Sequence, residues 1–146
     1  MNKLFFYNLL RYFFGILLIT TGIGKLLDNR GFAEIILTYQ FGLSLPVAMA
    51  LGVSVSLLEL WIGISILRNL HRREAAAATV VLHAGYIILA IVTNLRGLDL
   101  KNCGCFGVFW GRSMTWTTVV EDAVLLALAV TFYCLRSELR SRAATA

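Results

Sequence analysis

The chain has 146 residues, of which 59% are apolar and 14% charged, with one proline and a formal net charge of +5. Soluble domains are about 45–50% apolar and about 25% charged. A bilayer span needs about 20 mostly apolar residues, so this composition fills about four spans. It excludes a large soluble catalytic domain, a dinucleotide-binding domain and a disordered chain. The positive charge needs no nucleic-acid partner if the basic residues lie at helix ends.

Four apolar runs are long enough to cross a bilayer. They cover approximately residues 4–27, 46–67, 74–95 and 116–135. The first run is longer than the core of a signal peptide and no small-residue cleavage site follows it, so we expect it to remain as a span. After it, residues 32–41 have apolar side chains at nearly helical spacing but are too few to span. The predicted fold is therefore all-α: one membrane domain over residues 1–146, an antiparallel four-helix bundle with a short interfacial helix after the first span.

The distribution of basic residues predicts the orientation of the bundle. With the N-terminus inside, the inner side carries Lys3, Arg68, Arg72, Arg73, Arg136, Arg140 and Arg142. The outer side carries Lys25, Arg30, Arg96, Lys101 and Arg112. Because short loops rich in Lys and Arg favour the cytoplasm, we expect a multi-pass inner-membrane protein with both termini cytoplasmic. The loop before the fourth span then faces the oxidising side.

Three ionisable residues lie inside predicted spans: Arg11, Glu59 and His83. Counted from the nearer span ends, each lies roughly 10–14 Å from the inner boundary. A charge at that depth is costly unless it is paired or faces water. We therefore expect Arg11 and Glu59 to form a salt bridge with His83 beside them. Such a cluster is either a structural clamp that sets the register of the bundle or a proton or substrate site.

A second polar set lies near the predicted outer boundary. It consists of Lys25, Asn94, Glu121 and Asp122. One interpretation is that these side chains only reach the interface, with the acids favoured in the first turn of a helix. The other is that they form an acid–base shell beneath the loop that joins the third and fourth spans.

That loop contains two cysteines, Cys103 and Cys105, separated by Gly104. A thiol pair on an outer face forms a structural disulfide, a redox couple or two ligands of a soft metal. A single intervening residue closes a small ring, and strained, exposed disulfides are the more oxidising ones. Three basic residues near the pair in sequence favour the thiolate: Arg96, Lys101 and Arg112. Cys103 and Cys105 are therefore the candidate catalytic residues.

The third cysteine, Cys134, lies at the far end of the fourth span. It is about a bilayer width from the pair and cannot bond to it within one subunit. We interpret it as a small apolar side chain. A thiol relay across the membrane usually needs a second cysteine pair, so electrons that cross would need a quinone, another subunit or a second copy of the chain. No cofactor or metal motif is evident.

Several features of the chain occur together. They are Arg11 and Gly15, Gly22-Ile23-Gly24-Lys25-Leu26, Pro46, Glu59 and above all Asn102-Cys103-Gly104-Cys105-Phe106-Gly107. In this combination the chain resembles the methylamine-utilisation MauE family, within the DoxX-like group of small four-span membrane proteins. The resemblance implies disulfide chemistry on the periplasmic side. It also implies work beside a thioredoxin-like partner in the maturation of a disulfide-rich methylamine dehydrogenase subunit.

Three functions therefore stay open. The first is a thiol–disulfide oxidoreductase or maturation factor in which Cys103 and Cys105 exchange with a thioredoxin-like protein. The second is a protein that binds or transfers a soft metal, although two thiolates make an incomplete site. The third is a non-catalytic assembly subunit with an incidental disulfide. The direction of electron flow, the final substrate and whether the chain forms a homo-oligomer are not determined by the sequence.

Overall fold

The fold is all-helical in the part of the chain that the structure, a computed structural model, describes: the backbone of residues 3–144, with all side chains except those of residues 72 and 139–144. The helices are α1 (Lys3–Leu27), α2 (Asn29–Thr38), α3 (Leu45–Leu67), α4 (Arg72–Leu95) and α5 (Trp116–Ala144). Four of them, α1, α3, α4 and α5, are long and apolar enough to cross a membrane. The predicted fold class is confirmed.

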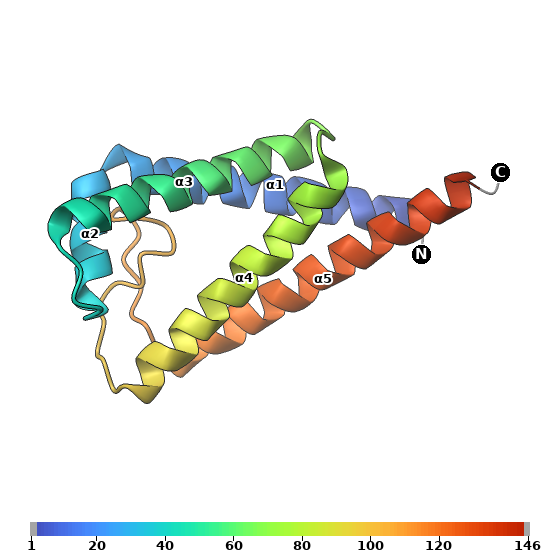
Figure 1. The fold of residues 1–146 in the computed structure, drawn as a ribbon. Coiled ribbons are helices and arrows are strands. Elements are labelled where there is room, and N and C mark those ends of the chain that lie inside the picture. The colour runs from blue at the N-terminus through green and yellow to red at the C-terminus, as the bar shows by residue number, and fades with distance from the viewer. Residues whose placement is uncertain (1–2, 145–146) are drawn as a thin grey trace.

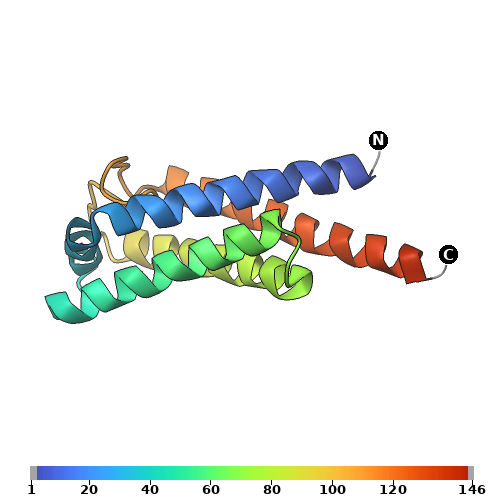
Figure 2. The same cartoon turned by 90° about the horizontal axis from the view of Figure 1, so that it is seen from above.

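The spans are arranged as two pairs, α1 with α3 and α4 with α5. The pairs diverge toward one end of the molecule, and there α2 and the cysteine loop, residues 96–115, lie between them (Figure 1). Both chain termini lie together at the opposite end (Figures 1 and 2). We call these the loop end and the terminal end. The cysteine loop and α2 therefore lie where the two helix pairs are furthest apart (Figure 1).

Local signals explain where α2 lies. Asp28 caps the helix, since its Oδ1 accepts a hydrogen bond of 2.8 Å from the Gly31 amide. Phe32 and Ala33 are buried, and the helix packs mainly on α3. The short helix that we predicted after the first span is present, but it begins and ends three residues earlier than expected because Asp28 starts it.

Close backbone contact sets the register of α1 on α3. A Cβ at Gly22 would lie 2.9 Å from the Ser56 carbonyl oxygen, and one at Gly63 would lie 2.9 Å from that of Gly15. Residue 15 therefore faces residue 63, and residue 22 faces residue 56, as two antiparallel helices require. Small residues at such crossings let membrane helices approach closely.

The last helix is longer than we predicted. We expected the fourth span to end near residue 135, but α5 continues to Ala144. Residues 116–144 contain no glycine or proline, and the Arg, Glu, Leu and Ala of the last turns are good helix formers. At the terminal end, Lys3 and Glu138 form an ion pair of 2.5 Å that joins α1 to α5.

The core has two parts along the bundle. At the terminal end, Tyr7 stacks on Phe132 with ring centroids 5.3 Å apart, and Phe14 is fully buried beside them. At the loop end a smaller cluster contains Tyr39, Cys103 and Met114. The cysteine loop is therefore packed into the bundle rather than free in solution.

Candidate functional site

The cysteine loop is held by its own backbone. The Cys103 amide donates to the Arg112 carbonyl at 2.7 Å, and the Met114 amide donates to the Leu100 carbonyl at 2.9 Å. Asn102 Oδ1 accepts a bond of 2.9 Å from the Gly104 amide, which makes the turn that carries the two cysteines. These bonds fix the cysteines on a short, closed segment between the two helix pairs.

Two glycines of the loop occupy positions that few other residues tolerate. Gly104 and Gly107 have φ values of 71° and 76°. A Cβ at Gly107 would also lie 2.5 Å from the Gly24 carbonyl oxygen at the end of α1. The Cys-Gly-Cys-Phe-Gly pattern therefore fits a loop that turns twice while it contacts the backbone of α1.

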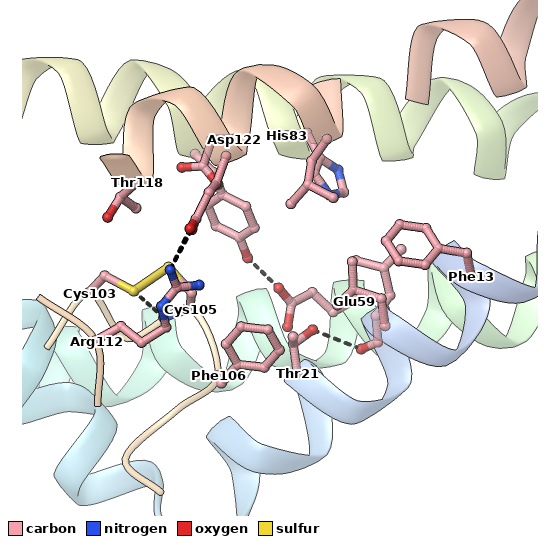
Figure 3. Close-up of a pocket in the computed structure, with 15 residues that line it drawn as sticks. Phe13, Thr21, Glu59, His83, Cys103, Cys105, Phe106, Arg112, Thr118 and Asp122 are labelled. Carbon is pink, nitrogen blue, oxygen red and sulfur yellow. Dashed lines mark hydrogen bonds and ion pairs between the residues drawn. A yellow bond between two sulfur atoms is a disulfide. The ribbon is translucent and has the colours of Figure 1, made fainter. Parts of the chain in front are cut away.

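Cys103 and Cys105 form a disulfide, with their Cα atoms 5.4 Å apart (Figure 3). The two sulfur positions differ in their surroundings. Cys103 is buried with 7% of its surface exposed, whereas Cys105 is half-buried. The Cys105 amide donates a hydrogen bond of 3.3 Å to the Cys103 sulfur. A negative charge on the Cys103 sulfur would be stabilised by this bond, and Cys105 is the more accessible of the two.

Tyr39, just after α2, supports the same segment. Its hydroxyl donates to the Cys103 carbonyl oxygen at 2.8 Å. Burial, with the nearby Asp122 carboxylate as a second cause, raises the pKa of Tyr39 to about 12, so the hydroxyl keeps its proton at neutral pH. Arg96 in turn donates a hydrogen bond of 2.7 Å to the Tyr39 carbonyl oxygen. The guanidinium of Arg96 therefore binds the end of α2 rather than the cysteine sulfurs.

Beneath the disulfide lies an ion pair inside the spans. Lys25 Nζ is 2.6 Å from Glu59 Oε1, and the two side chains are 2% and 1% exposed. The Tyr86 hydroxyl donates to the same Glu59 oxygen and lies 3.2 Å from Lys25 Nζ. Breaking such a pair by removing one partner leaves a buried charge without compensation, which is strongly destabilising.

The predicted salt bridge between Arg11 and Glu59 is wrong, because Lys25 takes the place of Arg11. In the α1–α3 register Glu59 faces residue 19, so Arg11 is about 12 Å further along the helix. Side chains of a helix also tilt toward its N-terminus. In this antiparallel pair Lys25 and Glu59 therefore tilt toward each other, while Arg11 and Glu59 tilt apart.

Arg11 has a different environment from the one we expected. Its guanidinium lies 4.6 Å from the centre of the Tyr12 ring, and its buried Nε has no hydrogen-bond partner among the described residues. His83 does lie near Glu59, in the wall of the same cavity, and its ring packs edge-on against Phe14 and Tyr86. The structure thus brings two of the three predicted residues together.

A cavity of about 240 Å³ connects the disulfide with these buried groups. Its labelled side chains surround an open space, with Cys103 and Cys105 on one side and Glu59 and Phe13 on the other (Figure 3). We call it the α1–α5 cavity. Its other residues include Leu17, Leu18, Thr21, His83, Tyr86, Phe106, Arg112, Thr118, Glu121, Asp122 and Leu125. A second cavity, of about 140 Å³, lies between Lys25, Tyr39 and the same disulfide.

The polar residues that we predicted near the loop end differ in their placement. Glu121 accepts two bonds of 2.7 and 2.6 Å from Arg112, and this hydrogen bonding raises the pKa of Arg112. Asp122 is buried and lines both cavities. Asn94 instead donates a hydrogen bond of 2.8 Å to the Ala90 carbonyl oxygen of its own helix. Glu121 and Asp122 therefore lie around the disulfide, whereas Asn94 is not among the residues that line either cavity.

Sequence reasoning missed Tyr39 and Tyr86. Tyr86 is three residues from His83 and shares its helix face, which was an available signal for a polar tip in the same site. Cys134 is free and exposed, on α5. Among the described residues, no group of three or more His, Cys, Asp or Glu side chains is close enough to hold a metal ion.

These features define a small membrane protein of four spans, with a disulfide loop packed above a buried ion pair. A family model described as "Methylamine utilisation protein MauE" matches residues 3–135. The chain belongs to the MauE family. Searches of curated proteins and of solved structures found no match. The resemblance noted in the sequence is thereby confirmed, and with it a link to methylamine utilisation.

Proposed function

We propose that the Cys103–Cys105 disulfide is the working centre of the protein and exchanges with a thioredoxin-like domain on the periplasmic side. The observation that carries the proposal is the asymmetry of the pair: Cys105 is half-buried and Cys103 is buried with an amide hydrogen bond to its sulfur. A thiol–disulfide exchange needs one sulfur that a partner thiolate reaches and one that leaves as a stabilised thiolate. The two cysteines match these two roles.

The exchange follows from this asymmetry. A thiolate of the partner attacks the Cys105 sulfur, the bond between the two cysteines breaks, and its electron pair stays on the Cys103 sulfur. The Cys105 amide stabilises that thiolate until it takes up a proton. The second thiol of the partner then attacks the mixed disulfide, which leaves the partner oxidised and both cysteines reduced. In the opposite direction, Cys103 is the thiol that resolves the mixed disulfide.

The orientation belongs to the same proposal. Both termini lie at the end opposite the cysteine loop, and that terminal end has the larger number of basic residues by sequence. The positive-inside rule then supports an orientation with the termini in the cytoplasm and the loop on the periplasmic side of the inner membrane. Exposed aromatic side chains of the loop region support an interfacial position, since Trp110 and Trp116 are 70% and 57% exposed.

The proposal is tested on intact cells whose outer membrane is permeabilised. Reduced thioredoxin, which does not cross the inner membrane, is added first, and a membrane-impermeant maleimide follows. We expect labelling of two thiols per chain only after thioredoxin treatment. The Cys103→Ser/Cys105→Ser variant is the matched control, since it retains Cys134 alone. Absence of labelling after thioredoxin, with labelling once the membranes are solubilised and reduced, would contradict the proposal.

A further inference from the structure

One residue that lines the α1–α5 cavity has an acceptor atom that the described part of the chain does not satisfy. Glu59 is 1% exposed, and its Oε2 has no hydrogen-bond partner among the described residues, although its Oε1 binds Lys25 and Tyr86. Leaving a buried acceptor unpaired costs free energy, so a donor from a ligand would be favourable there. A hydroxyl group of the ligand is a suitable donor.

His83 offers a second acceptor in the same wall. Its Nδ1 lies 2.8 Å from the Thr79 carbonyl oxygen. A carbonyl only accepts, so Nδ1 carries the proton and Nε2 of the neutral ring is left with a lone pair. Glu59 and His83 project from α3 and α4 toward the open space between the helices (Figure 3). A ligand with two hydroxyl groups would satisfy both acceptors.

The remaining walls indicate how a ligand enters. Phe13 of α1 is 42% exposed, and Leu17 of α1 and Leu125 of α5 are half-buried, all within candidate spans. Apolar lining side chains of the cavity thus lie at the surface of the two candidate spans α1 and α5. Toward the loop end it is bounded by Phe106 and by the ion pair of Arg112 with Glu121. An entrance between these apolar side chains would open to the bilayer, which favours a lipid-soluble molecule.

We propose that the α1–α5 cavity binds the quinol form of a quinone, with the ring between the apolar walls and its two hydroxyl groups donating to Glu59 Oε2 and His83 Nε2. Its volume of about 240 Å³ is just below the range of roughly 300–1,000 Å³ found for drug-sized ligands, which suits a single substituted ring. The lipid tail of such a molecule would leave between α1 and α5. The disulfide forms part of the same wall.

The inference rests on the proposed function for its redox step. The chain has three cysteines, so after Cys103 and Cys105 are reduced it holds no second pair that would reoxidise them. A quinone does so with balanced atoms and electrons. The two S–H bonds break and the S–S bond forms. Two electrons and two protons pass to the quinone oxygens, so that one dithiol and one quinone give one disulfide and one quinol.

The test uses the full chain in detergent, reduced and then freed of reductant. The probe is a short-chain benzoquinone with a fully substituted ring, which thiols do not alkylate. We expect one quinol to form per disulfide. Leu17→Trp, which fills the cavity, should slow this reoxidation by about tenfold or more because the ring loses its buried contacts. Leu9→Trp, on the exposed face of the same helix, should react like the wild type.

A second pair of variants keeps the test valid if Leu17→Trp fails to fold. Leu125→Trp fills the cavity from α5, and Val124→Trp, at an exposed neighbour, is its control. All variants should still be reduced by thioredoxin. Normal reduction of the wild type without reoxidation by quinone, or equal reoxidation of the cavity and control variants, would overturn the inference and leave the proposed function intact.

Failure of the proposed function would look different. In that case thioredoxin would not reduce the wild type, whereas the cavity could still be tested with the Cys103→Ser/Cys105→Ser variant. Retention of the short-chain quinol by this variant, lost on Leu17→Trp and kept on Leu9→Trp, supports the site independently of any exchange. No retention by the variant would count against the site.

Discussion

Glu59→Leu alone should lower the free energy of unfolding by about 3–5 kcal/mol, the range for breaking a buried ion pair. The change leaves the Lys25 ammonium and the Tyr86 hydroxyl without their acceptor in a site where the paired side chains are 2% and 1% exposed. The Lys25→Met/Glu59→Leu double variant should recover most of this loss, because it removes both charges and keeps the volume apolar. Thermal unfolding in detergent, followed by circular dichroism, measures the difference.

The matched control is the pair that the structure does not bring together. A cycle of Arg11→Met with Glu59→Leu should be additive within about 0.5 kcal/mol, since residues without shared contacts do not couple. Strong coupling of Arg11 to Glu59, or none of Lys25 to Glu59, would mean that the helix register described by Gly22 and Gly63 is wrong.

The second large effect concerns the two cysteines. Cys103→Ser should accumulate a mixed disulfide with a thioredoxin whose resolving cysteine is replaced and whose remaining cysteine is activated as a mixed disulfide with thionitrobenzoate. The accessible Cys105 thiolate attacks the thioredoxin sulfur and releases thionitrobenzoate, and no thiol at position 103 is left to resolve the adduct. Cys105→Ser should form at least about tenfold less of this adduct, since Cys103 is only 7% exposed. Nonreducing gels of the purified chain quantify the adduct. Equal trapping by the two variants would contradict the assigned roles.

Both single variants are expected to stay folded. The loop is held by the backbone bonds of Cys103 to Arg112 and of Met114 to Leu100, and by Tyr39, none of which needs the sulfur bond. Thermal unfolding close to that of the wild type is therefore the control for the trapping experiment. A large loss of stability would instead favour a structural disulfide.

The sequence was sufficient for the architecture because length and hydropathy are what a bilayer requires of a span. The spans could be predicted without knowing which individual residues, such as Phe14 and Ile62, would be buried in the core. The ion pair was different, because depth along the membrane was an incomplete guide. Arg11 and Lys25 both lie on α1 near its contact with α3, and only the direction of the side chains shows that Lys25 meets Glu59.

The candidate site was predicted in part. Cys103 and Cys105 were evident, because a closely spaced thiol pair has few uses outside redox or metal chemistry. Tyr39 and Tyr86 were not, since a tyrosine in an apolar run looks like any other core residue until its hydroxyl finds a partner. The cavity depends on the divergence of the two helix pairs, and no local pattern in the sequence describes that angle.

The central claim is that Cys103 and Cys105 act by reversible disulfide exchange, and its most direct measurement is made in cells that grow on methylamine. The full chain and its Cys103→Ser/Cys105→Ser variant are expressed at equal levels. Thiol trapping then reads the disulfide state of the methylamine dehydrogenase subunit, the final substrate that the family resemblance implies. In cells that express the variant, we expect the subunit to lack its native disulfides and to be less abundant than in cells that express the wild type. Native disulfides at the wild-type level in both strains would contradict the claim.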